Sequence, residues 1–184
     1  LDDFVRRRWQ GADPPSALTL WREAMDGLTA RRGDQRWAQK GTSYIFYAKE
    51  ILDAWPDVRL IYMLRNPWDL VASRRKRNPK MEAVLSTLLS WVKGTRIATR
   101  LQETCPDRFR IVRYESITNA GAGTVRDLCD WLQTPFSDDC LNIPHVNPSE
   151  NPYDLDGVDG QEGLNPSRIY QYVHRLRPHE IASV

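Results

Sequence analysis

Apolar positions along the chain follow two patterns, one typical of buried strands and one typical of helices. Residues 58–64 and 109–112 are almost continuously apolar, which is typical of short strands covered on both faces in a parallel sheet. Elsewhere apolar residues recur at helical spacing between capping residues, Gly and Pro. These stretches predict helices over residues 16–32, 43–54, 66–77, 80–104 and 121–133, with a further short strand at 36–39 and a last helix from Pro178.

Strands that alternate with helices predict an α/β fold with a parallel sheet and right-handed crossovers. A chain of 184 residues fits a single domain over 1–184. Residues 142–166 are rich in Asn, Pro, Asp and Gly and predict a long surface loop. Ligands of such sheets bind beyond the carboxyl ends of the strands. The residues after Leu64 and Val112 are therefore the first place to look for a site.

The first of these places begins a helix and carries a basic residue. Asn66 fits an N-cap, Pro67 the first helical position, and Arg65 lies just before them. A helix N-terminus and an Arg guanidinium both bind phosphate well. Ser73 lies seven residues after Asn66, about two helical turns, and so returns to the same face. The alternative is a capped helix whose basic end, residues 74–77, is simply exposed.

Charge is unevenly distributed, although the net charge is only +2. Residues 1–113 carry a balance of +9 and residues 114–184 a balance of −7. Two interpretations stand: solvated helix faces, or a basic site for a phosphate or polyanion in the first part. A nucleic-acid interface at residues 74–77 is disfavoured, because the run has no interleaved aromatic residues and the second part is acidic.

Other compositional features exclude several classes of protein. No apolar run reaches the roughly 18–20 residues of a bilayer-spanning helix, so we expect no membrane span. The three histidines are too scattered for a metal site. Three Cys without C-x-x-C spacing fit structural thiols in a reducing compartment. With no targeting segment visible, we expect a bacterial cytoplasmic protein, or one of the Golgi lumen if the source is eukaryotic.

Three segments resemble the sulfotransferase family in the family's own order. The first is WAQKGTSYIFYAKEILDAWPDVRL, which resembles a Lys-Thr-type motif followed by a helix and a turn. The second is RLIYMLRNPWDLVASRRKR, which resembles the 3′-phosphate-binding segment, with Arg65 and Ser73 at the family spacing. The third is IVRYESI followed by LCDWLQTPF. The resemblance covers residues 36–136 well and residues 137–184 weakly.

The resemblance implies a three-layer, P-loop-NTPase-like α/β fold with a central parallel sheet between helices. It also implies transfer of a sulfuryl group from 3′-phosphoadenosine 5′-phosphosulfate to a hydroxyl acceptor, leaving 3′,5′-adenosine bisphosphate. Arg65 and Ser73 would hold the 3′-phosphate, and Tyr114 would lie near the adenine or, equally, pack structurally. Lys40 would stabilise charge on the bridging oxygen; without the resemblance it would be an exposed Lys before a helix. The sequence does not identify the acceptor: a hydroxyl group on a small molecule, glycan, lipid or protein fits equally.

The chain also departs from the family pattern. No Gly/Ser/Thr-rich 5′-phosphosulfate loop precedes Arg36, so we expect a chain that is incomplete at its N-terminus. Thr42 stands where the cytosolic branch of the family has His, and the general base therefore stays unassigned. These departures keep open an alternative: a non-catalytic nucleotide-binding remnant or interaction module of the same fold.

Overall fold

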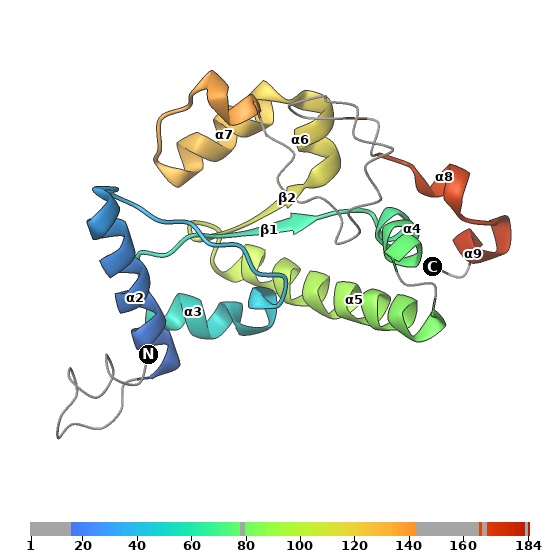
Figure 1. Cartoon of the computed structure of the whole chain (residues 1–184), viewed down its shortest axis with the longest axis horizontal. Coiled ribbons are helices and arrows are strands. Elements are labelled where there is room, and N and C mark those ends of the chain that lie inside the picture. The colour runs from blue at the N-terminus through green and yellow to red at the C-terminus, as the bar shows by residue number, and fades with distance from the viewer. Residues whose placement is uncertain (1–15, 78–79, 143–165, 167–168, 183) are drawn as a thin grey trace. The chain divides into compact units, whose positions relative to one another are not determined.

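The computed structural model describes residues 16–77, 80–142, 166, 169–182 and 184 (Figure 1). The chain divides into two compact units, Leu1–Val58 and Arg59–Val184. The predicted loop at 142–166 lies almost entirely outside the described residues.

The first unit holds the helices α2 (Ala17–Arg32) and α3 (Ala48–Ala54), with the 3₁₀-helix η1 (Tyr44–Tyr47) directly before α3. Ser16 caps α2, and Gly33 ends it in the left-handed region at φ 74°, which agrees with the helix predicted over residues 16–32. The strand predicted at 36–39 is wrong, because this segment has no regular structure. Four residues that begin with the charged Arg36 are too weak a signal without a neighbouring strand to pair with.

An aromatic cluster organises the first unit around this irregular segment. The ring centroid of Trp21 lies 5.1 Å from that of Tyr44 and 5.0 Å from that of Trp55. Aromatic pairs at such distances contribute about 0.5–1.5 kcal/mol beyond their burial. Beside the cluster, Arg22 donates to both carboxylate oxygens of Asp57 at 2.6 Å, which lowers the pKa of Asp57 and raises that of Arg22.

The second unit is built on two parallel strands, β1 (Leu60–Leu64) and β2 (Phe109–Arg113). Leu60 lies opposite Phe109, and Leu64 lies opposite Arg113. The crossover between the strands consists of α4 (Pro67–Arg77) and the long α5 (Met81–Thr104). The predicted parallel pairing is therefore confirmed, and the described part of this unit is an α/β fold with a two-stranded sheet.

The two strands of the sheet are covered to different extents. Phe109 and Val112 are buried, but Ile61 and Met63 on β1 are 39% and 48% exposed. The prediction that residues 58–64 are covered on both faces is thus wrong, since one face of β1 stays open among the described residues. At the outer edge of β2, the Gln102 side chain of α5 accepts a hydrogen bond of 2.7 Å from the backbone N–H of Ile111.

A small core joins α4 to the end of the chain, where α8 (Tyr172–Arg175) and α9 (Pro178–Ala182) lie. Trp68 packs against this core and donates from its indole nitrogen to the carbonyl oxygen of Ile181 at 2.9 Å. Arg75 on α4 forms an ion pair with Glu180 on α9. The buried members of the core are Val71, Ala72, Val84 and Leu176.

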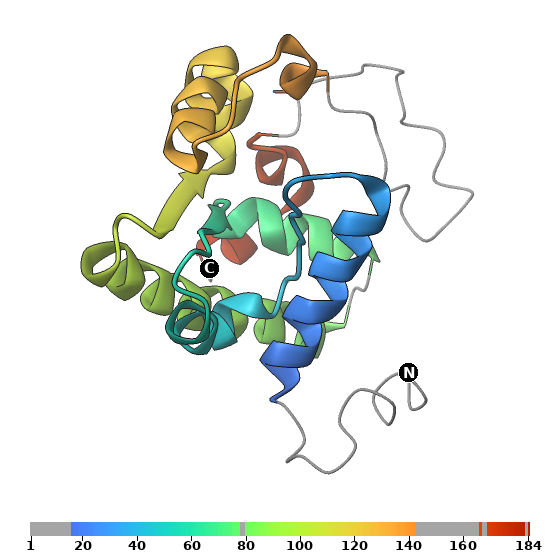
Figure 2. The same cartoon turned by 90° about the vertical axis from the view of Figure 1, so that its left-hand side faces the viewer.

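After β2 the chain forms α6 (Tyr114–Ala120), α7 (Ala122–Leu132) and the 3₁₀-helix η2 (Asp138–Leu141). Figures 1 and 2 show α6 and α7 side by side. Gly121 joins them at φ 40° and ψ −109°, a conformation that suits Gly. The sequence predicts α7 but not α6, because Glu115, Ser116 and Asn119 mask any helical apolar pattern there.

Candidate functional site

The turn between β1 and α4 has the cap that the sequence predicts. The Asn66 side-chain oxygen accepts from the backbone N–H of Asp69 at 2.8 Å, and the Asn66 carbonyl accepts from Leu70 at 3.3 Å. Pro67 is the first residue of the helix. Since Pro has no N–H and Asp69 gives its own to the cap, the turn keeps few backbone donors for a ligand.

Arg65 and Tyr114 meet at the carboxyl ends of the paired strands. The guanidinium carbon of Arg65 lies 4.6 Å from the centroid of the Tyr114 ring, a cation–π contact. Trp91 on α5 donates to the backbone oxygen of Arg65 at 2.9 Å, and the Arg65 side chain is 23% exposed. The expectation that both residues emerge at one edge of the sheet is confirmed.

Side chains alternate along a strand, so Arg65 continues the face of β1 that carries Ile61 and Met63. On β1 this face is exposed, whereas Val112 of β2, opposite Met63, is buried. An Arg fixed by stacking at the end of an exposed strand face keeps its five N–H donors in a defined plane. The arrangement suits recognition of an anion such as a phosphate.

Glu115 is a member of this site that the sequence analysis does not find. Its carboxylate accepts from the backbone N–H of Asn66 at 2.9 Å and from the Asn66 side-chain nitrogen at 3.1 Å. The signal available in the sequence is an acidic residue directly after Tyr114, at the end of the second strand. Because Glu115 takes another N–H of the turn, Arg65 rather than the helix N-terminus supplies the positive charge.

Asp69 is the second acidic residue of the site, and it is buried, with no exposed side-chain surface. It accepts from the Asn66 side-chain nitrogen at 2.7 Å and from the backbone N–H groups of Tyr170 and Tyr172 at 2.9 and 3.0 Å. Its carboxylate lies 3.9 Å from the Arg65 guanidinium. Asp69 thus ties the end of the chain to the turn that bears Arg65.

The remaining predicted residues, Ser73 and Lys40, belong to other segments of the chain. Ser73 is partly buried on α4, two helical turns beyond Asn66. Lys40 is exposed and belongs to the first unit, whereas the other three candidates belong to the second. Because the strand predicted at 36–39 does not form, Lys40 follows an irregular segment and not a strand. Its neighbour Gln39 accepts a hydrogen bond of 2.7 Å from Trp21.

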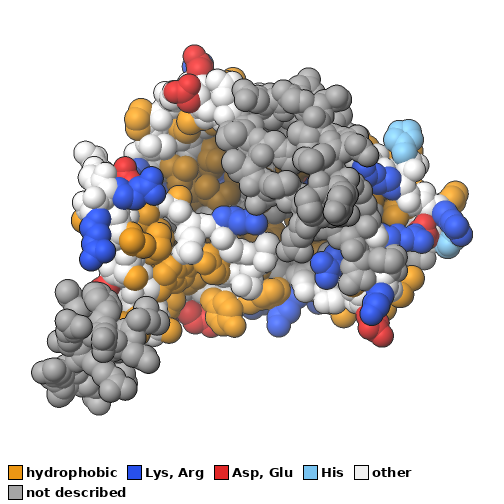
Figure 3. Space-filling model, viewed as in Figure 1, with side chains coloured by type: hydrophobic (Ala, Val, Ile, Leu, Met, Phe, Trp, Pro, Cys, Tyr) orange, Lys and Arg blue, Asp and Glu red, His pale blue; other side chains and the backbone are white. Residues whose placement is uncertain are grey.

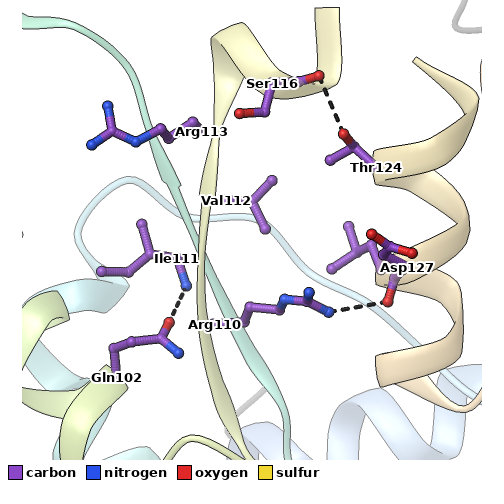
Figure 4. A pocket seen from close by; sticks show the side chains of 9 residues that line it. Gln102, Arg110, Ile111, Val112, Arg113, Ser116, Thr124 and Asp127 are labelled. Atoms are coloured by element: carbon purple, nitrogen blue, oxygen red, sulfur yellow. Dashed lines mark hydrogen bonds between the residues drawn. The ribbon is translucent and has the colours of Figure 1, made fainter. Parts of the chain in front are cut away.

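A cavity of about 440 Å³ lies elsewhere, between β2 and α7 (Figure 4). Its lining contains neither Arg65 nor Tyr114. The guanidinium of Arg110 in this cavity donates to the backbone oxygen of Asp127 at 3.0 Å, and Thr124 donates to a backbone oxygen of α6. These two side chains are thus engaged by the backbone, and since the cavity contains none of the predicted site residues it is not the candidate site.

On the face drawn in Figure 3, the Lys and Arg side chains of the described residues are scattered and are not gathered in one patch. Among the described residues no group of three or more His, Cys, Asp or Glu is arranged to hold a metal ion. In the same part of the chain, no helix combines the length and the apolar character needed to cross a membrane.

The sequence profile of the sulfotransferase family matches residues 5–138, which is most of the chain. The protein therefore belongs to the sulfotransferase family. No curated protein sequence matches it.

Two solved structures share its fold. The sulfotransferase domain of the Synechococcus PCC 7002 olefin synthase is 20% identical, with a TM-score of 0.62, covering 84% of this chain and 57% of that one. The sulfotransferase domain from the curacin biosynthetic pathway is 17% identical, with a TM-score of 0.64, covering 88% of this chain and 66% of that one. The chain thus spans less than two thirds of either domain.

Proposed function

We propose that this sulfotransferase uses 3′-phosphoadenosine 5′-phosphosulfate as its sulfuryl donor and a hydroxyl group as its acceptor. The observation that carries the proposal is the Arg65 guanidinium held 4.6 Å over the Tyr114 ring where two parallel strands end. In this proposal Arg65 and Ser73 bind the 3′-phosphate, and the Tyr114 ring lies beside the adenine. The three-layer, P-loop-NTPase-like arrangement of the family is part of the same proposal.

The surroundings of Arg65 support its role as an anion ligand. Trp91 holds its backbone and Tyr114 its side chain, so little conformational entropy is lost when a phosphate binds. The Asp69 carboxylate oxygen lies 3.9 Å from the Arg65 guanidinium nitrogen, beyond hydrogen-bonding distance. The carboxylate accepts its hydrogen bonds from the Asn66 side chain and from backbone N–H groups. The carboxylate thus places negative charge beside Arg65, while its own hydrogen bonds fix the turn and the segment of Tyr170 and Tyr172.

Lys40 has a different proposed task. When the acceptor oxygen bonds to sulfur, the bond between sulfur and the bridging oxygen breaks, and that oxygen gains negative charge. An ammonium group beside it stabilises the transition state more than the bound donor. Lys40 acts on turnover in this proposal, and Arg65 acts on binding.

Calorimetry with 3′,5′-adenosine bisphosphate tests the binding half of the proposal. Arg65→Ala weakens binding on the order of 10- to 100-fold, because a charge-assisted hydrogen bond is lost. Arg113→Ala is the matched control: it ends the neighbouring strand but projects to the other face, so affinity stays within about twofold. Adenosine 5′-phosphate, which lacks the 3′-phosphate, is insensitive to both changes. Equal losses for both ligands would mean that Arg65 acts through folding.

Transfer is tested separately, with radiolabelled donor and a panel of hydroxyl acceptors on the natural full-length protein. Binding of the bisphosphate without transfer to any acceptor supports the non-catalytic alternative. Transfer that requires the 3′-phosphate of the donor supports the enzyme.

A further inference from the structure

The amino-terminal half of α5 carries an exposed row of large apolar side chains. Met81, Leu85, Leu89 and Val92 are 66%, 52%, 71% and 38% exposed. Steps of four, four and three residues place them on one side of the helix, within an arc of about 80°. We call these four residues the α5 stripe. Single exposed apolar residues are normal on a protein surface, but a contiguous row of them indicates an interaction surface.

The α5 stripe is not the side of the helix that packs within its own unit. Val84 is buried in the core that α5 shares with α4, and Leu88 packs against that core. Trp91, about two turns after Val84 on the same side, donates to the backbone oxygen of Arg65. Figure 1 shows α4 beside this part of α5. The helix therefore has two apolar sides, and the described residues of its own unit cover only one of them.

The charges next to the α5 stripe are complementary to themselves. Glu82 and Lys93 are both exposed, and helical spacing places them on the same flank, one near each end of the stripe. Two copies of α5 can lie antiparallel, with Leu85 of each copy against Leu89 of the other. Glu82 of one copy is then level with Lys93 of the other to within about 1.5 Å, the rise of one residue. Two-fold symmetry repeats this pair of opposite charges.

We propose that the α5 stripe is the interface of a homodimer, in which α5 of a second copy packs against it in the antiparallel direction. The flanking charges favour a second copy over an unrelated partner, because one rotation satisfies both the apolar row and the charges beside it. The interface does not depend on the proposed function. Since about three turns of one helix bury less than the roughly 800 Å² per partner of a standard interface, we expect a dissociation constant in the micromolar range.

Sedimentation equilibrium of the natural full-length protein, across the micromolar range, measures the dimer. Leu89→Asp raises the dissociation constant about 100-fold or more, because the interface would bury an unpaired charge. Leu89 is the most exposed member of the α5 stripe, so this substitution does not challenge folding, and urea unfolding checks that stability is unchanged. The matched control is Ser90→Asp, an exposed position about 100° further around the same turn, which leaves the dimer intact.

Charge reversal tests the antiparallel register. Glu82→Lys alone and Lys93→Glu alone each raise the dissociation constant about tenfold, because each turns two attractive pairs into two repulsive ones. The double reversal restores it to within about threefold of the unsubstituted protein. Within one copy the two positions are about 16 Å apart along the helix, so the recovery requires contact between copies.

Three results would overturn the proposal. The first is a protein that stays monomeric throughout the concentration range, and in that case a loss of stability in Leu89→Asp would show that another segment of the same protein covers the α5 stripe. The second is an association that Leu89→Asp leaves unchanged, which would place the interface elsewhere. The third is a double reversal that associates no better than the two single variants.

Discussion

Lys40 and Arg65 are the two basic residues with the largest proposed roles, and the protein holds them in different ways. Arg65 directly follows a paired strand, and its backbone oxygen and guanidinium both contact fixed aromatic side chains. Lys40 lies in a segment without regular structure, where Trp21 holds the neighbouring Gln39. A strand end fixes a side chain through the backbone ladder, whereas an irregular segment depends on its side-chain contacts.

Gly41 shows how closely the Lys40 segment is packed. A Cβ atom at Gly41 would lie 2.5 Å from the Tyr44 ring, and that ring belongs to the aromatic cluster with Trp21 and Trp55. The segment is therefore held by a hydrogen bond from Trp21 to Gln39 on one side of Lys40 and by the close approach of Gly41 to Tyr44 on the other, rather than by a sheet. The comparison indicates that the proposed binding residue, Arg65, is fixed by secondary structure, and the proposed catalytic residue, Lys40, by contacts of its neighbours with aromatic side chains.

The largest expected effect is on turnover. Lys40→Ala lowers kcat about 10²–10³-fold in the natural full-length protein and changes nucleotide affinity only a few-fold, because one transition-state donor is lost. Steady-state kinetics with labelled donor, together with calorimetry, measures both quantities. The matched control is Lys49→Ala, which removes an exposed Lys of the same unit that pairs with Asp53. If turnover survives at Lys40, the residue is an ordinary surface Lys.

Asp69→Ala tests how the turn that bears Arg65 is stabilised, because the buried Asp69 carboxylate accepts a hydrogen bond from Asn66 in that turn. The change leaves the N–H groups of Tyr170 and Tyr172 without their acceptor, and it lowers the free energy of unfolding by about 2–4 kcal/mol. Urea unfolding followed by Trp fluorescence measures the loss, and Asp107→Ala at an exposed position is the control. Hydrogen exchange localises the loss to residues 169–182. Equal stability of the two variants would contradict the tie between Asp69 and the chain end.

The predicted elements show which parts of this arrangement the sequence encodes locally. The pairing of β1 with β2 and the Asn66 cap could be predicted from short stretches of the sequence. The apolar runs indicate the strands and the Asn-Pro pair indicates the cap, and both depend only on neighbouring residues. The roles of Asp69 and Glu115 do not, since their partners lie about 100 and about 50 residues away in the chain. The exposure of Ile61 and Met63 also escapes prediction, because an apolar run does not reveal which face lacks a cover.

A smaller effect is expected from Ser73. Ser73→Ala costs about 0.5–1.5 kcal/mol of bisphosphate affinity, the usual range for one hydroxyl hydrogen bond. Calorimetry with the bisphosphate and with adenosine 5′-phosphate measures the difference, and only the bisphosphate responds. Ser86→Ala, an exposed Ser on α5, is the control. An unchanged affinity would restrict the phosphate site to Arg65.

The smallest effect concerns pH and the first unit. Arg22 lowers the pKa of the Asp57 carboxyl in the folded protein, so the ion pair stabilises the fold above the unfolded pKa of about 3.9. The stabilisation is lost as the pH falls through the folded pKa. Both side chains are partly exposed, so the contribution is about 0.2–1 kcal/mol. Unfolding curves for the protein and for Asp57→Asn converge at acid pH; a constant gap between them would exclude the ion pair as the cause.

The hydrogen bond between Gln102 and Ile111 makes the two edges of the sheet differ in how readily each can pair with a further strand. Strand edges recruit other extended chains through their unpaired N–H and C=O groups, and proteins protect such edges to avoid unwanted association. The Gln102 amide occupies a donor on the outer edge of β2, so a strand that adds there must first displace a side chain of α5. An extended segment that joins this sheet therefore pairs more readily with β1, beside Arg65, than with β2.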